Sequence, residues 1–298
     1  KSWSHQVFKF CLCQLLSPRL FEMSFLPPWT IFSIIYTCIQ VLVSLGGWKG
    51  EIENPTPYSK FAGDTEKSTV PSRIGMLIIY TPALAVSIAG FLSSGGDMMY
   101  ALAASLLVVH FAKRDMEVIF LHRYSGNTET ATAVFIGIFY GITAGVILWA
   151  TRLAPVIYGP NVVVGICLFA VGILGNFYHH WLLTTFRNTD GTPKGQKTGM
   201  QKPLSLPHQV SQTAIEASRH YVVPHGGLFE FVTMPHYFFE LIGWFGIFVV
   251  VPRLNILLVC TGMFSYLAGR SVATTAWYKE KFGKVWPENR KHLIPFIF

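Results

Sequence analysis

Charged residues are scarce in this sequence. Only 13% of its 298 residues are Asp, Glu, Lys or Arg, whereas 51% are hydrophobic and 15% are aromatic. A soluble domain usually carries about 25% charged residues. The shortage excludes an ordinary soluble protein and predicts an all-α, polytopic membrane protein with about seven transmembrane helices. The net charge of +8 is typical of basic cytosolic loops in such a protein and does not indicate nucleic-acid binding.

Several familiar site motifs are also missing. The five cysteines are scattered, with no CxxC pair and no zinc spacing. His179 and His180 are adjacent, but neighbours on a helix point about 100° apart, so we predict no metal site. Neither GxGxxG nor GxxxxGK[ST] occurs, which excludes the Rossmann and P-loop ways of holding a nucleotide.

Apolar stretches separated by polar connections define the predicted spans. They lie at about 29–46, 74–92, 98–121, 132–151, 161–186, 236–251 and 255–278. In the fourth span, glycines at every fourth position (Gly137, Gly141 and Gly145) predict close helix packing.

We expect residues 23–298 to form a single membrane domain. Residues 1–22 precede Met23 and are predicted to be a non-native or disordered extension. Residues 189–217 are rich in Gly, Pro, Lys, Thr and Gln and are predicted to be a disordered insert. The connection after the fifth span and the C-terminal tail both carry a surplus of Lys and Arg, so we expect both on the cytosolic side.

The third predicted span carries an unusual row of ionisable residues. His110, Lys113, Arg114 and Glu117 fall at i, i+3, i+4 and i+7, which places them on one stripe of a helix. An arginine in the middle of a membrane costs roughly 2.5–3.5 kcal/mol on the insertion scale. The stripe is therefore expected to face a polar cavity inside the bundle.

Polar side chains recur on three further predicted helices. They are Asn176 and His180, His236 and Glu240, and Arg270 and Tyr278. Arginines paired with carboxylates suit a phosphate-bearing cofactor, because a guanidinium binds phosphate through two hydrogen bonds. They also suit an ion or proton path, as in a small transporter. The residues alone leave both interpretations open.

Several ordered motifs in the chain occur together in one known family. The C-terminal region contains YVVPHGGLF from Tyr221, MPHYFFE ending at Glu240, and RKHLIPFIF from Arg290. Upstream are HFAKRDME from His110 and LGNFYHH ending at His180. Together they resemble the steroid 5α-reductase and very-long-chain 2-enoyl-CoA reductase superfamily, and most closely its plant-type steroid 5α-reductase-like proteins.

The resemblance implies a seven-span reductase that encloses NADPH in the endoplasmic reticulum membrane, with the cofactor pocket and the C-terminus facing the cytosol. It identifies residues 221–298 as a cofactor-binding signature. Carried over position by position, the implied cofactor contacts are Arg114, Asn176, Arg187, Tyr221, His236, Glu240, Arg270 and Tyr278.

The resemblance also implies a pair of catalytic groups. In the steroid enzymes, a Tyr on the third span and a Glu near the second polarise the substrate carbonyl. Phe111 stands at the Tyr position, and a phenyl ring cannot donate a hydrogen bond. Glu53 is the candidate for the Glu, and Tyr237 is the candidate substitute donor. Alternative donors are Tyr80, Tyr124 and Tyr178.

These features favour an enzyme that uses NADPH to reduce a carbon–carbon double bond next to a carbonyl in a lipid. A 3-oxo-Δ4-steroid is the expected substrate. The alternatives are a very-long-chain trans-2-enoyl-CoA reductase, which would have partners in fatty acid elongation, and a lipid-binding pseudo-enzyme.

Overall fold

The computed structural model describes residues 25–58, 61, 68–124, 126–153, 159–188 and 221–298. The predicted extension at 1–22 and the predicted insert at 189–217 lie outside the described residues. The described chain is mostly helical, which confirms the predicted all-α class. Its longer helices are α3 (Ile31–Glu53), α4 (Ser72–Leu92), α5 (Met98–Met116), α6 (Thr130–Arg152), α7 (Pro160–Thr185), α9 (Pro235–Val250) and α10 (Leu254–Phe282).

Each of the seven predicted spans coincides with one of these helices. Five of them, α3, α4, α6, α7 and α10, are long and apolar enough to cross a membrane among the described residues. Helix α9 is apolar but has only 16 residues. Helix α5 carries the ionisable stripe and continues into a π-helical turn at Glu117–Leu121.

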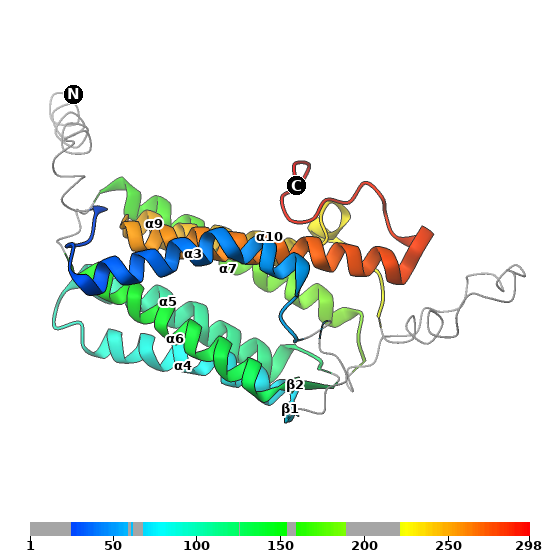
Figure 1. Ribbon diagram of the computed structural model, residues 1–298, viewed down its shortest axis with the longest axis horizontal. Helices are drawn as coiled ribbons and strands as arrows, with labels where there is room; N and C mark the ends of the chain where they lie inside the picture. Colours follow the sequence, from blue (N-terminus) through cyan, green and yellow to red (C-terminus); the bar gives the residue numbers. More distant parts are fainter. Residues whose placement is uncertain (1–24, 59–60, 62–67, 125, 154–158, 189–220) are drawn as a thin grey trace, which may run out of the picture.

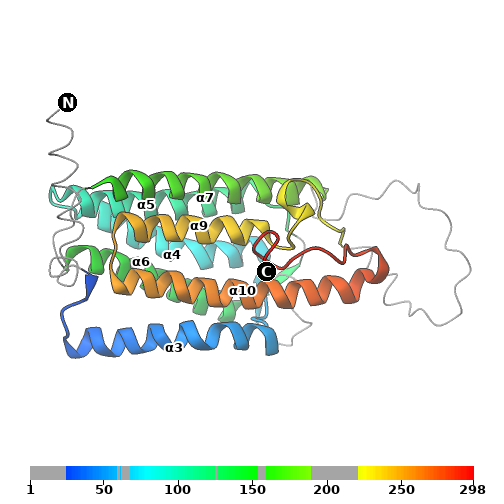
Figure 2. The same ribbon diagram turned by 90° about the horizontal axis from the view of Figure 1, so that it is seen from above.

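The helices run side by side along the long axis of the molecule (Figures 1 and 2). Helix α7 packs along α9, α3 along α10, and α4 along both α5 and α6. Two short strands, β1 (Thr69–Pro71) and β2 (Asn127–Glu129), pair antiparallel with Thr69 opposite Glu129. They lie near the end of the bundle at which α3 ends (Figure 1). This end also holds the candidate site.

Glycines permit the closest helix contacts. A Cβ on Gly172 of α7 would overlap the backbone of Gly243 on α9, and a Cβ on Gly137 of α6 would overlap the Ile78 carbonyl of α4. The predicted glycine ladder therefore makes a close contact at Gly137. At Gly141 and Gly145 an added Cβ would meet ordinary van der Waals neighbours.

Helix α3 is attached to the bundle by its polar side. Asn255 of α10 donates from Nδ2 to Oε1 of Gln40 at 2.7 Å, and Gln40 donates from Nε2 to the Asn255 carbonyl at 2.8 Å. Both residues are buried. Most apolar side chains of α3, including Ile31, Phe32 and Leu42, are exposed. An apolar surface facing outward is the pattern expected of a helix in contact with lipid.

Candidate functional site

One cavity dominates the described part of the chain. Its volume is about 910 Å³, and it is lined from α4, α5, α6, α7, α9 and α10 and from the segments that follow α3 and precede α9. Ligand sites usually measure about 300–1,000 Å³, so this cavity is large enough for a cofactor and part of a second ligand. Nine of the ten residues predicted for the site line it: Arg114, Asn176, Arg187, Tyr221, His236, Tyr237, Glu240, Arg270 and Tyr278.

Arg114 is the centre of a polar network at the inner part of the cavity. Its Nη1 lies 2.7 Å from Oε2 of Glu117, and its Nη2 donates to the Tyr80 hydroxyl at 2.5 Å. His180 Nδ1 is 2.9 Å from the same Nη1 and 3.0 Å from the same carboxylate oxygen. The guanidinium is thus oriented by partners from α4, α7 and the π-helical turn.

Asn176 joins this network to α9. Its side-chain nitrogen donates to Oε2 of Glu240 at 3.0 Å and to the His236 carbonyl at 2.8 Å. Its oxygen accepts a hydrogen bond from Lys113, whose Nζ also lies 2.9 Å from Oε1 of Glu117. Arg114 contacts His180 of α7, and His110 lies 3.3 Å from Glu240 of α9. The stripe on α5 therefore faces buried polar partners on α7 and α9.

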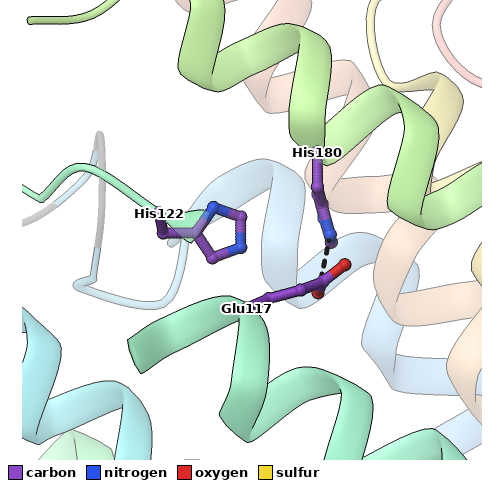
Figure 3. Close-up of side chains that lie close together, drawn as sticks. All are labelled: Glu117, His122 and His180. Atoms are coloured by element: carbon purple, nitrogen blue, oxygen red, sulfur yellow. Dashed lines mark hydrogen bonds and ion pairs between the residues drawn. The ribbon is translucent and has the colours of Figure 1, made fainter. Parts of the chain in front are cut away.

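Glu117, His122 and His180 form a compact cluster (Figure 3). One potential ligand atom from each lies within 4.8 Å of the other two, as in a metal site. However, both Glu117 oxygens already contact cations, because Arg114 lies against Oε2 and Lys113 against Oε1. A divalent ion would be repelled by these two positive charges. We assign the cluster to the polar network, and the absence of a metal site stays a prediction.

His122 belongs to this cluster but lies outside the predicted spans. It follows the π-helical turn with extended backbone, and its ring centroid is 4.9 Å from that of His180. Burial, reinforced by the nearby His180 and Arg114, lowers the pKa of His122 well below its ordinary value. The imidazole is therefore neutral at neutral pH.

Arg270 organises a second part of the cavity wall. It donates from Nη1 to Oε2 of Glu51 at 3.0 Å and to the Thr56 carbonyl at 2.8 Å, and from Nη2 to the Tyr58 carbonyl at 2.9 Å. The Tyr58 ring packs 4.1 Å from the same guanidinium. This arginine of α10 therefore fixes the segment that follows α3 against the cavity.

Arg187 and Arg123 contact each other at the cavity edge. Arg187 donates from Nη1 to the Arg123 carbonyl at 3.0 Å, and Arg123 donates to the Arg187 carbonyl. Both side chains line the cavity, and Arg187 lies over the Tyr221 ring at 5.6 Å. Arg123 was not among the predicted residues. The only indication of Arg123 in the sequence is that it lies just after the third predicted span.

The structure does not bring Glu53 to the cavity. Glu53 is exposed and pairs with Lys49 at 3.6 Å on the outer side of α3. The buried carboxylate of this helix is that of Glu51, which supports Arg270 and was not predicted. Tyr237 does line the cavity. Phe111 is fully buried against Tyr140, His110 and Trp244 and is not among the cavity-lining residues.

Comparison with known proteins gives a consistent family. Residues 198–298 match the family described as 3-oxo-5-alpha-steroid 4-dehydrogenase. The chain is 25% identical over 256 residues to 3-oxo-5-alpha-steroid 4-dehydrogenase 1 of Macaca fascicularis, covering 83% of this chain and 86% of the relative. It is 44% identical over 82 residues to steroid 5-alpha-reductase DET2 of Gossypium hirsutum, covering 26% and 30%.

An enoyl-CoA reductase is also among the similar proteins. The chain is 26% identical over 199 residues to very-long-chain enoyl-CoA reductase of Dictyostelium discoideum, covering 63% of this chain and 55% of the relative. These matches confirm the predicted resemblance to the steroid 5α-reductase and enoyl-CoA reductase superfamily.

Proposed function

We propose that this protein uses NADPH to reduce a carbon–carbon double bond conjugated to a carbonyl in a lipid, with a 3-oxo-Δ4-steroid as the substrate class. The observation that carries the proposal is the convergence of nine predicted site residues on one cavity of about 910 Å³. Reduction of a carbon–carbon double bond is the chemistry shared by the steroid and enoyl-CoA relatives, which makes the chain an oxidoreductase acting on CH–CH groups.

The residues around the cavity fit a phosphate-bearing nicotinamide cofactor. Arg114, Arg187 and Arg270 bring three guanidinium groups to its wall, and guanidinium is the group best shaped to bind phosphate. Asn176, Tyr221, His236, Glu240 and Tyr278 supply hydrogen-bonding groups from α7, α9, α10 and the segment before α9. A reduced nicotinamide bound there would supply a hydride to the β-carbon of the substrate.

The chain itself must stabilise the charge that develops on the substrate carbonyl oxygen. A hydrogen-bond donor aimed at that oxygen lowers the barrier most when it is fixed in a site that excludes water. Tyr237, the candidate donor from the sequence, lines the cavity, and so do two of the alternative donors, Tyr80 and Tyr124. A direct role for Glu53 requires a rearrangement of α3, since its carboxylate lies outside the cavity; the buried Glu51 acts through Arg270.

A very-long-chain trans-2-enoyl-CoA reductase is the second candidate. The similarity to the Dictyostelium discoideum enzyme favours it, and such an enzyme would work with other components of fatty acid elongation. The third candidate is a lipid-binding pseudo-enzyme, which the buried Phe111 favours because its ring cannot donate a hydrogen bond.

We place the protein in the endoplasmic reticulum membrane as a multi-pass protein in contact with membrane lipids. The five long apolar helices support a membrane location. The basic residues after α7 and in the C-terminal tail support a cytosolic position for the cofactor side.

The test is NADPH oxidation by the purified, detergent-solubilised full chain, with progesterone and a long-chain 2-enoyl-CoA offered separately. We expect cofactor oxidation that depends on progesterone. Oxidation with the enoyl-CoA alone would select the second candidate. NADPH binding without turnover of either substrate would reject the proposed reaction in favour of the pseudo-enzyme.

A further inference from the structure

Tyr80 of α4 occupies a distinctive position in the cavity wall. It lines the cavity and is buried, and its oxygen accepts a hydrogen bond of 2.5 Å from Nη2 of Arg114. The guanidinium carbon also lies 4.6 Å from the centroid of the Tyr80 ring. On its other side the guanidinium is held by Glu117 at 2.7 Å. The phenol is therefore fixed by a buried ion pair.

This geometry leaves the Tyr80 proton available. A guanidinium has donors and no acceptor, so Tyr80 must accept from Arg114 and can direct its own O–H elsewhere. Within the described part of the chain that O–H has no acceptor, although the hydroxyl belongs to a cavity-lining residue. A phenol whose oxygen accepts a hydrogen bond from a cation becomes a stronger hydrogen-bond donor itself.

Three of the other tyrosines that line the cavity lack this arrangement. Tyr237, Tyr124 and Tyr140 line the same cavity. Among the described residues, none of these three accepts a hydrogen bond from a guanidinium. Tyr178, the remaining alternative donor, is exposed on α7 and does not line the cavity. Fixed orientation and charge assistance thus coincide at Tyr80.

We propose that Tyr80 is the catalytic hydrogen-bond donor to the substrate carbonyl, with Arg114 as the residue that positions it. This inference rests on the proposed function. When hydride adds to the β-carbon, the electron pair of the double bond moves onto the carbonyl oxygen, where the Tyr80 O–H stabilises the enolate. A proton from water then adds to the α-carbon and the carbonyl re-forms.

The same assignment explains how the site tolerates Phe111. The Phe111 ring packs 5.8 Å from that of Tyr140 and is fully buried. The centroid of the Tyr80 ring also lies 5.8 Å from that of the Tyr140 ring. Tyr140 therefore connects the position that has lost a phenol to the position that supplies one, and α4 replaces α5 as the source of the donor.

The test compares Tyr80→Phe with Tyr237→Phe, each in the detergent-solubilised full chain. The first readout is kcat for progesterone reduction with saturating NADPH. We expect Tyr80→Phe to lower kcat on the order of a hundredfold or more, as the loss of one donor to an oxyanion does. We expect Tyr237→Phe to lower kcat by a much smaller factor, because among the described residues its hydroxyl accepts no hydrogen bond from a guanidinium.

The second readout does not need turnover. A conjugated ketone absorbs at longer wavelength when a donor hydrogen-bonds its oxygen, so progesterone bound with NADP⁺ is expected to show a red-shifted ultraviolet band. The shift should persist in Tyr237→Phe and disappear in Tyr80→Phe without loss of progesterone binding. A merely structural role for Tyr80 would not remove the shift while binding is kept.

The outcomes separate this inference from the proposed function. Normal kcat and a normal red shift in Tyr80→Phe would overturn the inference and leave the reductase intact. Loss of both in Tyr237→Phe alone would transfer the role to Tyr237. A Tyr80-dependent red shift in a wild-type protein that oxidises no NADPH would reject the reductase and keep Tyr80 as the group that binds the carbonyl.

Discussion

Arg114 and Glu240 are the residues on which cofactor binding is expected to depend most. Arg114 is paired with Glu117, and Glu240 accepts from Asn176 at 3.0 Å and lies 3.3 Å from His110. Arg114→Ala or Glu240→Gln removes one charge from a buried group of partners. Hydrogen bonds to charged groups contribute about 1.5–3 kcal/mol, so NADPH affinity should fall roughly tenfold to a hundredfold.

The measurement is NADPH binding by fluorescence or calorimetry on the two variants. Lys49→Ala is the matched control, because Lys49 is a charged residue that is exposed on α3. Its affinity should equal that of the wild type. Normal affinity in both cavity variants would contradict the assignment of the cavity to the cofactor.

His122 should make the stability of the protein depend on pH. Burial lowers the folded-state pKa of His122, and its interactions with His180, Arg114 and Lys113 lower it further, while Glu117 opposes them. In the unfolded chain its pKa is about 6.5. As the pH falls below that value, the unfolded chain binds a proton that folded His122 does not. Stability should therefore decline below about pH 6.5, by up to about 1.4 kcal/mol per pH unit.

Thermal unfolding of His122→Gln in detergent, followed from about pH 7.5 down to pH 5.5, checks this expectation. The variant should lose part of the decline seen in the wild type. His225→Gln is the control, because His225 is exposed. If His122→Gln and His225→Gln gave the same curve as the wild type, the burial of His122 would not be linked to folding.

Individual site residues could be predicted unevenly from the sequence. The α5 stripe was predictable because charges inside an apolar helix need buried partners. Glu51 was not, since its partner Arg270 is 219 residues away and helix periodicity gives no sign of that pairing. Tyr80 was one of several equivalent tyrosines until its contact with Arg114 distinguished it.

The geometry of the site depends on the close packing of helix α7 against helix α9. Helix α7 carries Asn176, and α9 carries Glu240, which that asparagine bonds. An added Cβ on Gly172 would overlap the α9 backbone, whereas one on Gly243 would have its nearest neighbour at 3.9 Å. Gly172→Ala should therefore destabilise the protein by about 1–3 kcal/mol and weaken NADPH binding.

Gly243→Ala is the matched control on the facing helix. It should be neutral or slightly stabilising, because alanine is favoured over glycine within a helix. Thermal unfolding in detergent and NADPH titration compare the two variants. Equal behaviour of Gly172→Ala and Gly243→Ala would mean that the two helices do not approach each other as closely as described.

At the scale of elements, hydropathy predicted the helices better than their ends. Each predicted span matches a helix, but α3 continues to Glu53, beyond the predicted end near Gly46. The extra turns are polar, and they are held by the pairing of Glu51 with Arg270. The π-helical turn at Glu117–Leu121 was also not predictable, because hydropathy does not distinguish a single π-helical turn from the α-helix that it continues.

The molecule as a whole has two distinct ends, which allows its orientation to be tested. The turn between α4 and α5 lies at one end of the bundle, and the segment after α10 lies at the other (Figures 1 and 2). Ser93 is exposed at the first end and Glu288 at the second. Basic residues mark cytosolic loops, and the segment from α10 to the C-terminus is rich in them: Lys279, Lys281, Lys284, Arg290 and Lys291.

Single cysteines at these two positions, Ser93→Cys and Glu288→Cys, in a chain otherwise free of cysteine, report the orientation in sealed microsomes. A membrane-impermeant maleimide should label Glu288→Cys in intact vesicles and Ser93→Cys only after detergent is added. The reverse pattern would place the cavity on the lumenal side, where cytosolic NADPH cannot reach it. Equal labelling of both positions in intact vesicles would contradict a bundle that spans the membrane, because its two ends would then face the same compartment.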